Sequence, residues 1–301
     1  ELPEGHSGIF ISEILLGQLY NNMNEFEKAE AFIKSGLAKL KAAEGDFMYW
    51  EGDAYYTLAM VAESKGEPEA ASMYYAASEK AYAAGYGDEY DNIYLDFLSN
   101  ASRFYAANNQ FAKAKTILDK TLGYVRSVQE GPSQAMFNQL LNMGEIYYLA
   151  HRYPETLQYS NEAIDVLNQY LAKASTPIDS ARMQFKIPRA ILINQQALYA
   201  MQPVRDTAFL NRVSRRMQDA INILEQRKGL IDDAESIQVL IAENASIYGF
   251  ARQVEMELYK LTGTAQHLDK YVDLYESALY SRIRNRLNKA AAIRFANLPP
   301  A

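Results

Sequence analysis

Apolar side chains recur at helical spacing through the first 172 residues, and the helices they predict come in pairs. The stretch Leu140–Ile164 shows this most clearly. Its first half places Met143, Gly144 and Tyr147 on one face, because positions i, i+1 and i+4 lie close together on a helix. The small glycine lets a second helix approach closely. An antiparallel pair of this kind cannot bury its apolar face alone, so it predicts neighbouring pairs of the same type.

A small residue at the same place in each predicted pair marks a repeat. The residue is Gly17, then Ala59, Ser102 and Gly144, which gives steps of 42, 43 and 42 residues. Four pairs in one phase predict an all-α fold, namely a right-handed superhelical solenoid of antiparallel helix pairs with a period of about 42 residues. These regular pairs define a first predicted region, residues 1–173.

The repeat becomes less regular after residue 173. We interpret residues 174–301 as a second region of irregular pairs that ends in a C-terminal helix. Pro188 interrupts an otherwise helical stretch, 178–201, so we expect that helix to kink or split near Lys186. Further helices are expected over residues 206–227, 234–261 and 265–290.

The first pair carries a small residue, a tyrosine, an aromatic residue and an alanine in order, at Gly17, Tyr20, Phe26 and Ala29. This order resembles the tetratricopeptide (TPR) pattern, and the resemblance covers residues 8–172. The step of about 42 residues is longer than the common 34. It is similar to the long-helix variant of kinesin light chains and of bacterial TPR arrays. The resemblance implies a non-catalytic scaffold for protein–protein interaction.

Residues 257–301 carry a second resemblance. They close with Phe295, Ala296 and Pro299, and the run is similar to the join between bacterial TPR arrays and CHAT domains, which are caspase- and separase-like cysteine peptidase domains. This resemblance implies that the chain is the regulatory TPR region of a larger CHAT-type peptidase and that the peptidase domain follows it. Its own peptidase domain would then be one of its partners. The alternative is a stand-alone TPR adaptor.

Candidate catalytic and metal-binding residues are sparse. The sequence has no cysteine, which removes thiolate metal sites and a cysteine nucleophile from this chain. The histidines His6, His151 and His267 lie far apart, whereas a metal site needs three or four converging ligands. We interpret all three as surface histidines. The glycines form no phosphate-binding motif, so we expect no cofactor and no enzymatic activity. Spacing alone leaves open a triad of distant residues.

The formal net charge is −7, and acidic residues concentrate in the first hundred positions, where 18 acidic and 6 basic side chains give −12. Such a surface repels nucleic acid and anionic membranes. It is either a solvated surface or a docking face for a basic partner. No apolar run approaches the ~18–20 residues of a membrane span, and the first residues lack the pattern of a signal peptide. We therefore expect a cytoplasmic location.

A basic stripe is predicted on the last helix, where Arg282, Arg286 and Lys289 share one face. It is either a solvated stripe or an interface. The interface would be with a following domain or with the acidic first hundred residues of another copy.

The free side of the first helix in each pair predicts a groove, because in TPR arrays this side lines the concave surface. Tyr20, Tyr105 and Tyr147 are expected to fill the core between helices. The residues on the free side are expected to hold an extended peptide or a helix through hydrogen bonds and apolar contacts. The candidate groove residues are Asn21, Asn22, Tyr56, Glu63, Arg103, Glu145 and Tyr148.

Overall fold

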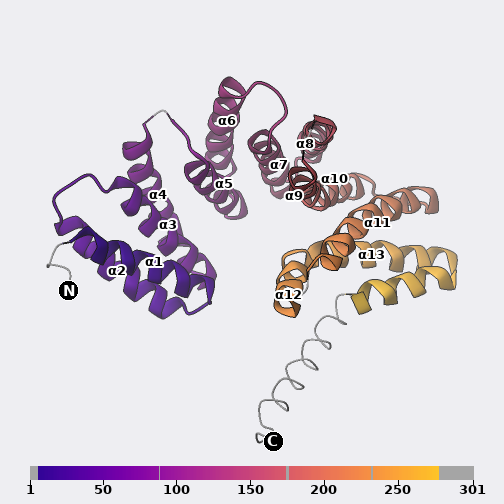
Figure 1. The fold of residues 1–301 in the computed structure, drawn as a ribbon. Coiled ribbons are helices and arrows are strands. Elements are labelled where there is room, and N and C mark those ends of the chain that lie inside the picture. Colours follow the sequence, from indigo (N-terminus) through magenta and orange to yellow (C-terminus); the bar gives the residue numbers. More distant parts are fainter. Residues whose placement is uncertain (1–5, 88, 174–175, 232, 278–301) are drawn as a thin grey trace, which may run out of the picture. The chain divides into compact units, whose positions relative to one another are not determined.

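The computed structural model describes residues 6–87, 89–173, 176–231 and 233–277, and helices are the only regular structure in those ranges (Figure 1). The expectation of an all-α repeat fold is confirmed. A last helix follows α13 over residues 265–277. The helices before it are α1 (Ser7–Asn22), α2 (Phe26–Ala42), α3 (Met48–Ser64), α4 (Pro68–Tyr86), α5 (Asn92–Ala107), α6 (Phe111–Val128), α7 (Gln134–Leu149), α8 (Tyr153–Lys173), α9 (Pro177–Gln184), α10 (Ile187–Met201), α11 (Thr207–Gly229), α12 (Ala234–Glu243) and α13 (Ala245–Thr262).

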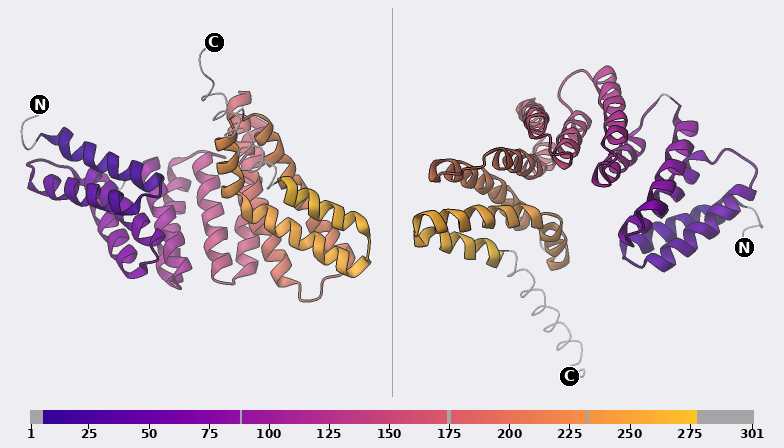
Figure 2. Two further views of the ribbon diagram at one scale, coloured as in Figure 1. Left: turned by 90° about the horizontal axis from the view of Figure 1, so that it is seen from below. Right: turned by 180° about the vertical axis from the view of Figure 1, so that it is seen from behind.

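The chain divides into two compact units, residues 1–125 (unit 1) and residues 126–301 (unit 2). Unit 1 contains the pairs α1–α2 and α3–α4, then α5 and most of α6. Unit 2 contains the pairs α7–α8 and α10–α11, followed by α13 and the last helix. The two helices of a pair lie side by side, as Figures 1 and 2 show for α1 with α2 and for α3 with α4. The boundary between the units is not the point where the repeat loses its regularity. The regular helix pairs continue to residue 173, where α8 ends, and the short helix α9 follows.

Every regular pair turns through one residue in the left-handed backbone region. These residues are Asn24, Gly66, Asn109 and His151, with φ of 58°, 73°, 61° and 58°. They recur at 42, 43 and 42 residues, as the small anchor residues do. One hydrogen bond closes each turn, from an amide to the carbonyl five residues earlier; Arg152 N to Tyr147 O, at 2.9 Å, is an example. This bond is typical of a helix that ends at a left-handed residue, so the repeat extends to the backbone of the turns.

The small anchor residues differ in how tightly they are packed. A Cβ added to Gly17 would lie 2.5 Å from the side chain of Ile33, which is fully buried on α2. Ala59 and Ser102 are fully buried as well. At Gly144 an added Cβ would lie 3.6 Å from its nearest neighbour, which is an ordinary contact. Close approach of the two helices therefore requires glycine at the first anchor but not at the fourth.

Tyrosine fills the core at two of the three predicted positions, because Tyr105 and Tyr147 are buried. Tyr20 is only half-buried, and its ring stacks on Phe32 with the centroids 5.3 Å apart. The core of unit 1 is strongly aromatic. For example, the ring of the buried Tyr82 on α4 lies 5.0 Å from that of Phe97 on α5. Aromatic packing thus joins the second pair to the third.

Two short helices, α9 and α12, make unit 2 irregular. The predicted split near Lys186 occurs, because α9 ends at Gln184 and Pro188 lies in the first turn of α10, where its missing N–H is tolerated. The prediction of one helix over residues 234–261 is wrong, because the helix is interrupted at Asn244, between the end of α12 and the start of α13. The side-chain amide of Asn244 donates to the carbonyl of Leu240 at 2.8 Å and so competes with the helical backbone.

Candidate binding surface on the first helices

The inner face of each unit is the side of its first helices that the second helices leave uncovered. The first helices are α1, α3 and α5 in unit 1 and α7, α10 and α13 in unit 2. Successive first helices contact each other directly, as α1 does with α3 and as α10 does with α7 and α13. The candidate groove residues of the sequence lie on these helices.

On the inner face of unit 1 the side chain of Asn100 links Tyr56 to Arg103 by hydrogen bonds. The side-chain amide of Asn100 donates to the hydroxyl of Tyr56, which joins α5 to α3. The Nη2 of Arg103 donates to the side-chain Oδ1 of Asn100 at 2.8 Å. The ring of Tyr56 packs edge-on against Phe97, 5.3 Å away, and burial raises the pKa of Tyr56 to about 12. The hydroxyl therefore stays neutral and serves as a fixed hydrogen-bond group.

The remaining candidates of unit 1 are more open. Glu63 is exposed and accepts a hydrogen bond of 3.0 Å from the hydroxyl of Tyr75, which is buried on α4. Asn22 at the end of α1 is also exposed, and Asn21 is half-buried. The structure leaves these three available for contact, and their binding role remains a prediction.

Glu145 is buried, with an exposed fraction of 5%, so its carboxylate cannot contact a ligand directly. Its Oε1 accepts a hydrogen bond of 2.7 Å from the Nε of Arg189 on α10. The Arg189 side chain is 48% exposed. Glu145 was predicted as a groove residue. At this place the exposed side chain is instead Arg189, which the buried carboxylate of Glu145 holds in position.

Lys186 forms a second bridge between the same two helices. Its Nζ lies 3.3 Å from the Oδ1 of Asn138 on α7. Tyr148, the last candidate on α7, is half-buried, and its ring lies 5.7 Å from that of Tyr153. The sequence analysis did not single out Lys186 or Arg189. The sequence feature that could have identified them is the presence of two basic residues on either side of Pro188, where a new first helix begins.

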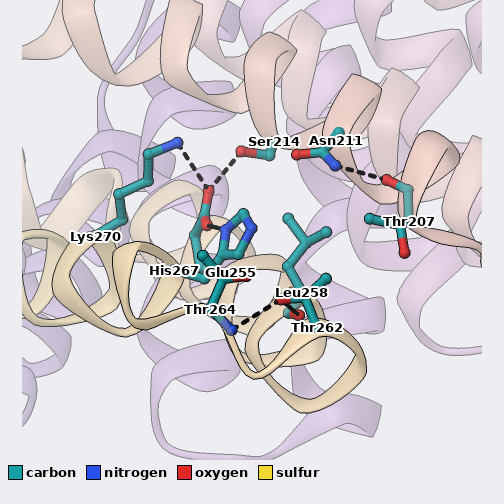
Figure 3. Close-up of polar contacts among 9 residues, drawn as sticks. All are labelled: Thr207, Asn211, Ser214, Glu255, Leu258, Thr262, Thr264, His267 and Lys270. Atoms are coloured by element: carbon teal, nitrogen blue, oxygen red, sulfur yellow. Dashed lines mark hydrogen bonds and ion pairs between the residues drawn. The ribbon is translucent and has the colours of Figure 1, made fainter.

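A separate polar cluster surrounds Glu255 of α13 (Figure 3). Glu255 is 4% exposed, and it accepts a hydrogen bond of 2.5 Å from the hydroxyl of Ser214 on α11. On its other side it contacts the last helix, through Nδ1 of His267 at 2.7 Å and Nζ of Lys270 at 3.9 Å. The interpretation of His267 as a surface histidine is wrong, because only 12% of its side chain is exposed.

This cluster does not form a nucleophile–base pair, because Ser214 and His267 both bond to the carboxylate and not to each other. Among the described residues, no three His, Cys, Asp or Glu side chains converge to hold a metal ion. In the same part of the chain, no helix combines the length and apolar character that a membrane crossing requires. The predicted basic stripe of Arg282, Arg286 and Lys289 lies outside the described residues.

No family model matches the chain, and no curated protein sequence matches it. Solved structures do match. The crystal structure of BtubC from P. vanneervenii superposes with a TM-score of 0.56 at 15% identity, over 74% of this chain and 82% of that one. TPR-like repeats described as a kinesin light chain of Podospora anserina give a TM-score of 0.52 at 14% identity, over 74% of this chain and all of that one.

The crystal structure of the apo form of RapI superposes with a TM-score of 0.50 at 12% identity, over 92% of this chain and 98% of that one. Identities this low show a shared fold and no more. The comparisons thus confirm the TPR-like helical repeat, including its likeness to kinesin light chain repeats.

Proposed function

We propose that this protein is a non-catalytic scaffold that binds a protein or peptide segment on its inner faces. One observation carries the proposal. Polar side chains bridge successive first helices on the inner face of both units, Asn100 with Tyr56 in unit 1 and Arg189 with Glu145 in unit 2. The fold supports the proposal too, since helical solenoids present extended surfaces to their partners.

The inner faces suit an extended peptide better than a small molecule. Asn, Tyr, Arg and Glu side chains offer hydrogen bonds along several helices, which matches the repeated polar groups of a peptide backbone. The bridges also hold these groups in place before binding, which lowers the entropy cost of recognition.

A phage-displayed library of twelve-residue peptides would test the proposal. Selected peptides would be synthesised and their affinity measured by fluorescence anisotropy. We expect Glu63→Ala combined with Tyr148→Ala to weaken binding about tenfold, in line with the loss of contacts worth about 1.4 kcal/mol. The matched control is Glu69→Ala combined with Tyr170→Ala, which changes an exposed glutamate on α4 and a half-buried tyrosine on α8, both second helices.

Equal affinities for the two double variants would place binding elsewhere and refute the proposed surface. A library that yields no binding peptide for the full chain would refute peptide binding itself. Circular dichroism of each variant would verify that the helices remain folded.

We infer a finer role from the sequence of residues 257–301, which resembles the join between TPR arrays and CHAT peptidase domains at Phe295, Ala296 and Pro299. In this role the array regulates an attached cysteine peptidase; the alternative is a stand-alone adaptor. Reading the coding region that follows Ala301 separates the two. A downstream α/β segment with a His and a Cys would support the peptidase, and a stop codon would remove it.

A further inference from the structure

We propose that the uncovered face of α1 is a self-association surface, on which α1 of a second copy of this chain packs. The face consists of Leu15, Leu16 and Leu19 on α1 and of Met23 at its C-cap. Their exposed fractions are 48%, 40%, 52% and 55%. Their spacing places them along one side of the helix, so they form a contiguous apolar patch, which typically marks an interaction site. The inference is independent of peptide binding on the inner faces.

The repeat shows how the positions of Leu16 and Leu19 are used in the other first helices. Leu16 precedes the anchor Gly17 by one residue, and Leu19 follows it by two. At the same two places in α3, α5 and α7, every residue is buried. These residues are Leu58 and Val61, Ala101 and Phe104, and Met143 and Ile146. Leu16 and Leu19 therefore stand at packing positions of the repeat, although in α1 both are exposed.

Within unit 1 a neighbouring helix pair covers these positions. Leu58 of α3 belongs to the same apolar cluster as Ile33 and Leu37 of α2. The ring of Phe104 on α5 lies 4.8 Å from that of Tyr75 on α4. First helices also contact each other directly, as α1 does with α3. The uncovered face of α1 thus continues a packing surface that the other pairs use against helices.

Two further positions make the apolar face of α1 wider than ordinary stacking requires. The position of Leu15 is polar in the later first helices of the regular pairs, and that of Met23 is polar or small. The corresponding residues are Thr57, Asn100 and Asn142 for Leu15, and Lys65, Asn108 and Ala150 for Met23. A helix pair stacked on α1 as in the other repeats would not need Leu15 or Met23. The wider face therefore favours an occupant other than one more repeat.

The charge of this region favours a second copy as that occupant. Glu13 is the one acidic or basic residue in the sequence of α1, and it is paired with Lys39 of α2. The exposed residues of α1 are uncharged, so two copies of the face are complementary, and a two-fold axis between them gives a closed, symmetric contact. The surroundings repel each other, because residues 1–100 hold 18 acidic and 6 basic side chains. Association should therefore be weak and should strengthen with salt.

Sedimentation equilibrium of the full chain tests the proposal. We expect the weight-average mass to rise from that of a monomer toward twice that value as the protein concentration increases. Raising the salt concentration from about 0.1 M to about 1 M shortens the Debye length from about 10 Å to about 3 Å, which screens the acidic surroundings and should tighten the dimer. A monomer at every concentration would overturn the proposal and leave a further helix pair as the occupant. Association that weakens with salt would overturn it too.

Leu19→Glu should raise the dissociation constant of the dimer at least tenfold, because it places two carboxylates in the apolar contact. The matched control is Met73→Glu on α4, which also replaces an exposed apolar side chain by glutamate. This variant should keep the dissociation constant of the parent. Circular dichroism would verify that both variants remain helical. Equal dissociation constants for the two variants would exclude the face of α1 as the contact.

A mixture of oppositely charged variants tests the symmetry of the contact. Leu19→Lys alone should weaken the dimer as Leu19→Glu does. An equimolar mixture of the two should associate at least tenfold more tightly than either variant alone, because each copy then meets the opposite charge across the two-fold axis. A change in α1 that only disturbed its fold would not be rescued in this way. A mixture no tighter than its components would refute the pairing of α1 with α1.

Discussion

The Nδ1 of His267 lies 2.7 Å from the Oε2 of Glu255, and through this contact the last described helix is attached to α13. Glu255 is almost fully buried and also accepts a hydrogen bond from Ser214 of α11 (Figure 3). One carboxylate therefore joins three helices. Among the described residues of this helix Leu274 is buried and Tyr271 is half-buried, whereas Leu268, Val272 and Tyr275 are exposed, so polar contacts provide much of its attachment.

Glu255→Ala should release helix 265–277 from α11 and α13. Leaving buried donors such as the Ser214 hydroxyl without their acceptor typically costs about 1–3 kcal/mol, so faster amide hydrogen exchange is expected at residues 265–277 and unchanged exchange in α3 and α4. Glu255→Gln, which keeps a side-chain oxygen as acceptor, should have a smaller effect. Asp273→Asn is the control for loss of a carboxylate, because Asp273 is exposed on the helix 265–277. Unaltered exchange in Glu255→Ala would show that apolar contacts hold the helix.

Gly17→Ala and Gly144→Ala should have opposite effects. At Gly17 the new methyl group would collide with the buried Ile33, so we expect a loss of about 1–3 kcal/mol in the free energy of unfolding. At Gly144 the methyl group has room, and alanine is favoured over glycine inside a helix by about 1 kcal/mol. Urea unfolding of both variants checks this. Destabilisation of equal size would mean that helices α7 and α8 approach as closely as α1 and α2.

The sequence was sufficient to predict the helix pairs because their packing depends on residues that recur at fixed spacing. Gly17 and Gly144 were assigned the same anchoring role from this spacing. The spacing could not show that Gly17 is tightly enclosed and Gly144 is not, because the space at Gly17 depends on the size and position of Ile33 on the facing helix.

His151→Gly should stabilise the protein. His151 has a φ of 58°, at the turn position where the other regular pairs have Asn24, Gly66 and Asn109. The left-handed conformation costs a residue with a Cβ roughly 1–2 kcal/mol, against which glycine loses some unfolded-state entropy. We expect a net gain of about 0.5–1 kcal/mol in urea unfolding. The substitution also removes the contact of His151 Nδ1 with the Tyr153 hydroxyl, so Tyr153→Phe measures that loss separately. A lower stability of His151→Gly than of Tyr153→Phe would contradict the prediction.

The candidate site was less predictable than the fold. Glu145 was placed on the inner face by the repeat, but its burial and its pairing with Arg189 depend on a helix 44 residues further along, beyond the α9 insertion. Glu255 gave no signal for a similar reason. Its partners Ser214 and His267 are 41 and 12 residues away, and only the packing of three helices brings them together.

Tyr105→Phe should leave stability unchanged or raise it slightly, whereas Tyr75→Phe should lower it. The hydroxyl of Tyr105 is buried and has no hydrogen-bond partner among the described residues, so removing it also removes a desolvation cost. The hydroxyl of Tyr75 donates to the carboxylate of Glu63 at 3.0 Å, and a hydrogen bond to a charged group contributes about 1.5–3 kcal/mol. Both rings are buried, so the two variants differ in the hydroxyl alone. Thermal unfolding of each compared with the parent measures the difference, and equal losses would contradict it.

Alkaline pH should destabilise unit 1, because burial raises the pKa of both Tyr56 and Tyr94 to about 12. The unfolded chain releases these protons near the ordinary tyrosine pKa of about 10. Between about pH 10 and 12 the unfolded state therefore binds fewer protons than the folded state, so stability is fully present below pH 10 and falls as the pH rises through this window.

Tyr94→Phe isolates this effect. Phenylalanine cannot ionise, so between pH 8 and pH 11 the free energy of unfolding in urea should fall less in the variant than in the parent. Absorbance at 295 nm would show the same tyrosine titrating late in the folded parent and missing from the variant. If parent and variant lost equal stability between pH 8 and 11, ionisation of Tyr94 would not be coupled to folding. The aromatic contact of Tyr94 with Tyr86, 5.2 Å away and nearly parallel, is retained by phenylalanine, so packing does not confound the comparison.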